Sequence, residues 1–337
     1  YRQGSGKHSN DSRLMMQVTH DQALSWADPL LVLDGRDRDP QTTVISGAVC
    51  QTADDSLLVV FGAVEGLAEE VYMFSDEGRQ LPRPVLATRS TDGGRSWSEP
   101  WAITPSTLLN PGVTSAPFIL PDGELGIPLE YRISPAGPNG SALMLSRDHG
   151  NPFDEPLVVA ADRSERRYLS DARYSLLPDG RLISLLWTIR HADEVTVEVN
   201  RVLSSDRGRT WTAPEAIGFV GQITVPLALS GGRLICVSNY RLPPEGIRLR
   251  GSLDDGATWP LGPVQLWDPA ANRTTALPAL EREDGVDAGQ IWEALDDFTF
   301  GTPDLVALPD DDLLMTYYAS VDGITHVRAC RFRVDFP

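Results

Sequence analysis

An eight-residue pattern that recurs along the chain constrains its fold more than any other feature of the sequence. Residues 90–97 read Ser-Thr-Asp-Gly-Gly-Arg-Ser-Trp, which fits the form Ser-x-Asp-x-Gly-x-Ser/Thr-Trp, and residues 204–211 and 252–259 are full copies. Residues 19–26 have alanine in place of the glycine, and residues 146–153 have phenylalanine in place of the tryptophan. The copies begin roughly 50 to 70 residues apart, which predicts a repeat protein built from one supersecondary unit per copy.

Each copy has the composition of a tight turn between two strands. The aspartate at its third position can accept hydrogen bonds from turn amides, and the glycine supplies a backbone conformation with positive φ. The tryptophan can then pack back against its own strand pair. The sequence before a copy has a regular order: first an apolar run, then a Pro/Asp/Gly turn, and then a second apolar run, as in residues 118–131. This order predicts four strands per repeat: a hairpin of strands A and B, strand C leading into the eight-residue turn, and strand D after it.

The predicted strands indicate six repeats. There are six strands C, the last at residues 325–334, but only five A–B pairs. The sequence therefore predicts an all-β fold, a six-bladed β-propeller of four-stranded antiparallel blades, with residues 1–337 as a single domain. The first blade is expected to be incomplete at the N-terminus, with Tyr1 and Arg2 ending its strand B; the alternative is a ring closed by strand sharing between the termini. The A–B pairs are predicted at residues 44–55 and 57–61, 118–123 and 125–131, 174–180 and 182–189, 227–232 and 234–240, and 305–312 and 313–318.

With this repeat the sequence resembles the sialidase (neuraminidase) superfamily, in which the eight-residue pattern is called the Asp box. The resemblance covers almost the whole chain and implies a β-propeller in which the boxes are structural. It also implies three arginines that hold a sugar carboxylate, a tyrosine nucleophile activated by a glutamate, and an aspartate as acid/base. The Arg-Ile-Pro segment that supplies the first arginine is absent from this sequence. Four tyrosines remain open as the nucleophile: Tyr131, Tyr168, Tyr240 and Tyr317.

The charge of the chain argues against two classes of partner. With 47 acidic and 29 basic residues the formal net charge is −18, so neither nucleic acid nor an anionic membrane is expected to bind through bulk electrostatics. No apolar run approaches the roughly 18 residues that a membrane helix needs. Cys50, Cys236 and Cys330 lie in apolar runs and are predicted to be free buried thiols, and the five histidines lack metal-ligand spacing, so no metal or cofactor is expected. We expect a secreted or periplasmic location rather than a cytoplasmic one.

Arginines recur at one position of the repeat, the end of strand B. Arg2, Arg132, Arg190 and Arg241 hold equivalent positions in four blades, so radial symmetry would bring their guanidinium groups to one rim. A guanidinium binds a carboxylate through two parallel hydrogen bonds, which makes such a ring a candidate anion site. We add Arg38, from the link before the second blade, to these predicted substrate-binding residues. The alternative is that each arginine is structural and pairs with an acidic residue of a neighbouring blade.

Four residues are candidates for the catalytic groups. Asp39 opens an innermost strand and is the acidic residue of its link expected to face the channel. Glu130 adjoins the Tyr-Arg pair of its blade, although strand alternation would place its side chain opposite that tyrosine. His8 lies in a Gly/Ser-rich loop between strands B and C, and Tyr240 precedes one of the predicted binding arginines.

These residues favour a sialidase-like, exo-acting glycoside hydrolase that removes an acidic sugar from a glycan. The arginines would bind the sugar carboxylate, and a tyrosine or carboxylate would stabilise the oxocarbenium-like transition state. One alternative is a polysaccharide lyase on a uronate-containing glycan, in which a histidine or tyrosine removes the α-proton and the product absorbs ultraviolet light. The other is a non-catalytic propeller that binds acidic oligosaccharides.

Overall fold

The computed structural model describes residues 1–6, 9–65, 83–134, 137–147, 152–267, 298–309 and 312–335. Over these residues the regular secondary structure consists of β-strands, apart from two short 3₁₀ turns, η1 (Gly35–Asp37) and η2 (Ser230–Gly232). The strands form six antiparallel sheets. The chain divides into two compact units, Tyr1–Val158 and Val159–Pro337, and each unit contains three of the sheets.

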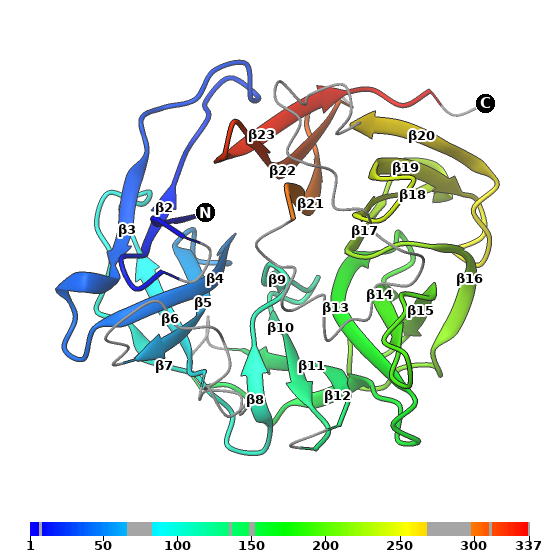
Figure 1. Ribbon diagram of the computed structural model, residues 1–337, viewed down its shortest axis with the longest axis horizontal. Coiled ribbons are helices and arrows are strands. Elements are labelled where there is room, and N and C mark those ends of the chain that lie inside the picture. Colours follow the sequence, from blue (N-terminus) through cyan, green and yellow to red (C-terminus); the bar gives the residue numbers. More distant parts are fainter. Residues whose placement is uncertain are drawn as a thin grey trace. The chain divides into compact units, whose positions relative to one another are not determined.

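The first unit contains three sheets whose strands follow one another along the chain (Figure 1). Their strand orders are β1-β2-β3, β4-β5-β6-β7 and β8-β10-β11-β12, and β9 also pairs with β10. The strands are β1 (Arg2–Gln3), β2 (Arg13–Met16), β3 (Leu30–Asp34), β4 (Thr42–Gln51), β5 (Leu57–Glu65), β6 (Val85–Ser90), β7 (Trp101–Ala102), β8 (Leu109–Gly112), β9 (Phe118–Ile119), β10 (Leu125–Arg132), β11 (Asn139–Ser146) and β12 (Leu157–Ala160).

The second unit repeats the same meander in three further sheets. Their orders are β13-β14-β15-β16, β17-β18-β19-β20 and β21-β22-β23. The inner strand β13 packs against β17, and β17 packs against β21. The strands are β13 (Arg167–Leu176), β14 (Leu182–Arg190), β15 (Glu198–Ser204), β16 (Glu215–Val220), β17 (Thr224–Ala228), β18 (Leu234–Tyr240), β19 (Gly246–Ser252), β20 (Leu261–Trp267), β21 (Phe300–Ala307), β22 (Leu313–Val321) and β23 (Ile324–Phe332).

The fold class is the one predicted from the sequence: the protein is all-β, a six-bladed β-propeller of mainly four-stranded antiparallel sheets. Every predicted A–B pair overlaps two paired strands, and β6, β15 and β19 each end on the first residue of an Asp box. The first sheet has three strands, of which β1 contains two residues, and the last sheet, β21-β22-β23, also has three; that the first blade is incomplete stays a prediction. That residues 1–337 form one domain stays a prediction.

Strand A of the third sheet departs from the predicted hairpin. It is interrupted, because β8 and β9 both pair with β10 while residues 113–117 between them belong to neither strand. Pro111 lies within β8 and Pro117 directly precedes β9, and neither residue has an amide hydrogen to donate to the ladder. The register also shifts between Glu130 and Arg132 of β10.

The Asp boxes are turns held together by their own polar side chains. The Ser90 hydroxyl accepts a hydrogen bond from the box glycine amide at 2.8 Å, and Asp92 accepts bonds from the amide (2.9 Å) and hydroxyl (2.6 Å) of Ser96. These bonds from Ser96 hold the pKa of Asp92 far below its usual value. The Trp97 indole N–H donates to the glycine carbonyl at 3.1 Å, and the other two full copies make the same set of bonds. The boxes are therefore structural, as the resemblance implies.

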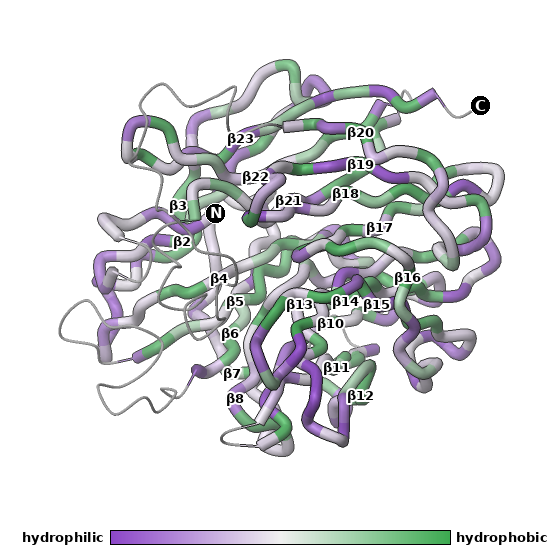
Figure 2. The backbone as a smooth tube through the Cα atoms, turned by 45° about the vertical axis from the view of Figure 1, so that its right-hand side comes forward, coloured by the Kyte–Doolittle hydropathy of each residue, from purple (hydrophilic) through white to green (hydrophobic). Residues whose placement is uncertain are grey.

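Apolar side chains fill the space between neighbouring sheets within each unit. In the first unit one cluster includes Leu58, Ile127 and Leu129, all at most 1% exposed; in the second, another includes Ile235 and Met315, both fully buried. Figure 2 shows hydrophobic stretches along the strands and hydrophilic residues at many of the turns. Burial of this apolar surface is the main favourable term for the fold.

The remaining predictions can be compared with the structure only over the described residues. His8 lies outside the described residues. No helix in the described part of the chain is long and apolar enough to span a membrane. Cys236 is a buried free thiol as predicted, whereas Cys50 and Cys330 are free but only partly buried.

Candidate active site

A tyrosine and a glutamate meet at one end of the first sheet of the second unit. Tyr168, near the start of β13, is opposite Ile189 near the end of β14, so it lies at the end of the sheet away from the Asp box. Its hydroxyl donates to Glu194 Oε1 at 3.4 Å. Glu194 lies in the turn after β14 and has a φ of 52°. The His191 ring packs edge-on against the Tyr168 ring, with ring centres 5.0 Å apart.

A partly buried carboxylate, Asp171, lies near two arginines, Arg173 on the same inner strand and Arg241 directly after β18. β13 has an irregular register between Ser170 and Arg173, and Asp171 there has a φ of 47°. The Arg173 Nη2 lies 3.3 Å from Asp171 Oδ1 in an ion pair whose side chains are 10% and 19% exposed. Burial raises the pKa of Asp171, while the charges of Arg173 and Arg241 act in the opposite direction. The three side chains therefore form one coupled cluster.

Arg241 connects this cluster to the tyrosine. It directly follows β18, its Nε donates to the Phe300 carbonyl at 2.9 Å, and its guanidinium carbon lies 4.6 Å from the centre of the Phe298 ring. Phe298 packs with Tyr168 around the same small apolar cluster. Gly301 leaves room for the guanidinium, because a Cβ at that position would lie 2.2 Å from Arg241 Nη2. Tyrosine, carboxylates and arginines thus form one continuous group within the second unit.

This group has the components for chemistry on an anionic substrate. Two guanidinium groups can bind a carboxylate or another planar anion. A phenol hydrogen-bonded to a carboxylate is an activated nucleophile, because the carboxylate can accept its proton. Among the described residues, no group of three or more His, Cys, Asp or Glu side chains could hold a metal ion.

A second charged cluster lies at the end of β10 in the first unit. Glu130 accepts a short hydrogen bond from the Asn139 amide, and Arg132 Nη1 donates to the Gly137 carbonyl at 3.2 Å. Arg83 interacts electrostatically with both: burial lowers its pKa, Glu130 counteracts that shift and Arg132 adds to it. Two of the predicted site residues, Glu130 and Arg132, are therefore close together, with Arg83 as a third charged group outside the predicted site.

The other predicted residues have mixed surroundings. Arg2 donates to the carbonyls of Val44, Gly6 and Ser9 at 2.6–2.9 Å. Arg190 is half-exposed and pairs with Asp193 of its own turn. Arg38 Nε donates to Thr42 Oγ1 at 3.2 Å. Asp39 is exposed at the cis bond before Pro40, and Tyr240, the last residue of β18, is half-buried. The roles assigned to all of these residues, and to His8, stay predictions.

The structure adds residues that the predicted site did not include. Arg173 and Asp171 stand in a charged stretch, Arg166 to Arg173, that is equally consistent with a solvated loop between blades. Their burial depends on the irregular register of β13, which no local sequence signal reveals. Glu194 could have been considered from its position, because it follows the end of a strand B on the side of the sheet away from the box.

The fold and this cluster define an Asp-box β-propeller with an arginine-rich candidate site. The chain belongs to the BNR repeat-like domain family, whose model matches residues 1–270. A curated relative is a sialidase from Micromonospora viridifaciens, 28% identical over 222 residues, which are 57% of this chain and 33% of that protein. The matched region thus spans about a third of the length of that relative.

Solved structures show the same fold over nearly the whole chain. A protein of unknown function from Dyadobacter fermentans has a TM-score of 0.73 at 21% identity, covering 99% of this chain and 87% of its own. The Hadza microbial sialidase Hz136 has a TM-score of 0.66 at 18% identity, covering 97% of this chain and 61% of its own. At these identities the likeness establishes the fold.

Proposed function

We propose that this protein is an exo-acting glycoside hydrolase that removes an acidic, carboxylate-bearing sugar from glycans. The observation that carries the proposal is the hydrogen bond from Tyr168 to Glu194, in the same side-chain group as Arg173 and Arg241. The family and the similarity to proteins named sialidases support this class of reaction. A secreted or periplasmic location, where glycans are met, goes with this function.

Arg173 and Arg241 are the groups proposed to hold the sugar carboxylate. Both are largely buried, so their hydrogen bonds to an anion are shielded from water. Each charge-assisted bond contributes about 1.5–3 kcal/mol. Asp171 keeps the two guanidinium groups in position when no ligand is bound, because it is close to both.

Tyr168 is the proposed nucleophile and Glu194 its base. The phenol oxygen forms a bond to the anomeric carbon as the bond from that carbon to the leaving oxygen breaks, and the phenol proton passes to Glu194. The leaving oxygen takes a proton from an acid, a role that the resemblance assigns to an aspartate. Water then cleaves the tyrosyl–sugar bond, so the configuration of the sugar is retained.

The test compares Tyr168→Phe and Glu194→Gln with wild type on a panel of sialosides and uronate-terminated glycans. Loss of the base is expected to lower kcat by about 10²–10⁴-fold, with binding of the acidic sugar preserved. Tyr318→Phe, a change in the half-buried tyrosine on β22, is the matched control and should leave kcat unchanged. Released sugar is measured by mass spectrometry, and ultraviolet absorbance is recorded in parallel.

Each alternative predicts a different result in the same experiment. An unsaturated product absorbing in the ultraviolet would identify a lyase on a uronate. Binding that depends on Arg241 without turnover of any glycan would identify a non-catalytic glycan-binding propeller. Full activity of both Tyr168→Phe and Glu194→Gln would rule out the proposed nucleophile and base.

A further inference from the structure

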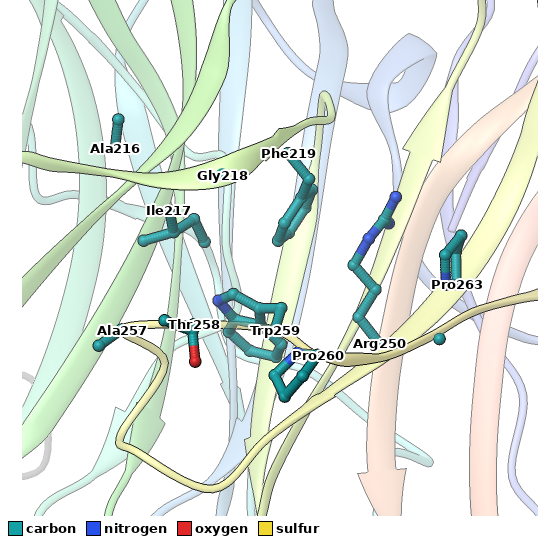
Figure 3. A pocket seen from close by; sticks show the side chains of 11 residues that line it. Ala216, Ile217, Gly218, Phe219, Arg250, Ala257, Thr258, Trp259, Pro260 and Pro263 are labelled. Carbon is teal, nitrogen blue, oxygen red and sulfur yellow. The ribbon is translucent and has the colours of Figure 1, made fainter.

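A groove on the second unit lies apart from the group just described. It runs between β16 and β20 and has a volume of about 660 Å³. It is lined by residues 216–219 of β16, 257–259 of the last Asp box, Pro260 after that box, 262–263 of β20 and Arg250 of β19. Figure 3 shows the side chains of Phe219, Trp259 and Arg250 lining the same space from three elements. We call it the β16–β20 groove.

The aromatic side chains and the arginine of the groove form one stack. The Arg250 guanidinium carbon lies 4.2 Å from the centre of the Phe219 ring, and the Phe219 and Trp259 rings meet edge to face with centres 5.9 Å apart. All three side chains are partly exposed. The groove therefore offers an apolar surface of ring edges beside a positive charge.

The groove is positively charged although the protein carries an excess of acidic residues. Its only ionisable lining residue is Arg250, and none of the lining residues is acidic. Among the described residues Arg250 donates one side-chain hydrogen bond, from Nη1 to Ser238 Oγ at 3.2 Å, and forms no ion pair. Within the described part of the chain, its remaining N–H groups therefore have no carboxylate partner.

Comparison with the other repeats shows that this arginine is not required by the fold. Arg250 stands two residues before its Asp box, and the same position in the other well-formed strands C holds Thr88, Met144 and Val202, each at most 1% exposed. The corresponding groove of the first unit contains Met144, Asp154 and Glu155, and its volume is about 280 Å³. In this repeat, therefore, Arg250 stands where the other repeats have a buried residue, and the adjoining groove is larger than its counterpart in the first unit.

We infer that the β16–β20 groove is a second binding site for an acidic saccharide unit, independent of the proposed catalytic function. The carboxylate of the sugar would pair with Arg250, and the apolar face of the sugar ring would pack on Trp259 and Phe219. The volume fits one or two sugar units. An extended peptide fits less well, because Pro260 and Pro263 remove the amide hydrogens that edge pairing with β20 would use.

The test follows the indole N–H resonances of the eight tryptophans in protein labelled with ¹⁵N-tryptophan. The Trp259 resonance is assigned with Trp259→Phe, and sodium glucuronate, its uncharged amide and a tetraglutamate peptide are titrated separately. Glucuronate is expected to shift the Trp259 resonance saturably. The amide should bind at least about tenfold more weakly, the loss expected for one charge-assisted bond.

Variants separate this site from the candidate active site. Arg250→Gln should weaken glucuronate binding at Trp259 by at least about tenfold, whereas Arg248→Gln, on the same strand and outside the groove lining, should not. Phe219→Leu is a second variant if Arg250→Gln unfolds. Arg241→Gln should leave the Trp259 shift intact whatever it does to turnover.

Three results would overturn the inference. They are equal affinity for glucuronate and its amide, unchanged binding in both Arg250→Gln and Phe219→Leu, and no shift of the Trp259 resonance at any glucuronate concentration. A shift of that resonance by tetraglutamate at lower concentration than by glucuronate would also overturn it, and would assign the groove to an acidic peptide.

Discussion

The arginines that end strand B differ in what their guanidinium groups bind. Arg2 donates to three backbone carbonyls, and Arg190 pairs with a neighbouring aspartate in solvent. Arg241 bonds to the Phe300 carbonyl and the Gln222 side chain, and it stacks on Phe298 beside a partly buried carboxylate. Of these three, Arg241 has the surroundings that most resemble an anion site, since exposed pairs such as that of Arg190 contribute little.

Asp171 should make binding of an acidic sugar depend on pH. Its raised pKa means that its negative charge is lost as pH falls toward that pKa, while the arginines stay charged. The ligand carboxylate then no longer competes with Asp171, so affinity should rise as the pH falls toward that raised pKa, and it should fall again where the sugar itself is protonated. Calorimetric titration checks this, and Asp171→Asn should remove the dependence. Affinity that rises with pH in the wild type would contradict it.

Gly301 provides a second probe of Arg241. Gly301→Ala would place a Cβ 2.2 Å from Arg241 Nη2. The arginine side chain is flexible and the backbone at position 301 is not, so the added methyl group should displace the guanidinium. We expect about tenfold weaker binding of an acidic sugar. Gly180→Ala is the control for backbone strain alone, since its φ is +87° and nothing lies within 4 Å of the added Cβ. Wild-type affinity in Gly301→Ala would show that Arg241 does not contact the ligand.

The Asp boxes differ in how far their tryptophans support the sheets. Trp97 packs against the apolar cluster around Phe61, whereas Trp26 is 40% exposed in the box that has alanine instead of glycine. Trp97→Ala should cost about 2–3 kcal/mol of unfolding free energy, less than the ~3–5 kcal/mol of a fully buried aromatic. Trp26→Ala should cost about 1 kcal/mol or less. Urea unfolding measures both, and equal losses would refute this ranking.

The elements were predictable where local chemistry decides them. The ends of β6, β15 and β19 follow from the Asp box, because its serine, aspartate and glycine form the turn with bonds inside eight residues. The interruption between β8 and β9 and the irregular register of β13 were not predictable. Both depend on how a strand fits its neighbours, as the positive φ of Asp171 illustrates.

The candidate site was predictable only in part for the same reason. Repeat symmetry correctly identified the end of strand B as an arginine position, but it treated Arg190 and Arg241 as equivalent. The i,i+3 spacing of Arg190 and Asp193 was a local signal of a surface pair. The pairing of Tyr168 with Glu194, in contrast, requires the turn after β14 to fold back over β13, which a single sequence does not specify.

Across the whole molecule, acidic residues outnumber basic ones by enough to affect stability. The net charge of −18 opposes compaction through self-repulsion. The ion pairs of the described residues include several exposed pairs, such as Arg190–Asp193, which contribute about 0–1 kcal/mol each. Added salt screens the repulsion among the excess carboxylates and also weakens these exposed pairs. The relief of repulsion should therefore be the larger of the two effects on stability.

This balance predicts that the melting temperature rises with ionic strength. Between 10 mM and 300 mM NaCl the Debye length falls from about 30 Å to less than about 8 Å, so repulsion between distant carboxylates is screened while contacts at 3 Å persist. We expect an increase of at least about 2 °C, equivalent to roughly 1 kcal/mol for a chain of this size. Circular dichroism melts in NaCl and KCl at matched ionic strength measure it, and equal effects of the two salts separate screening from binding of one cation. A melting temperature that falls in both salts would mean that short-range ion pairs, not the excess negative charge, dominate the electrostatics of the fold.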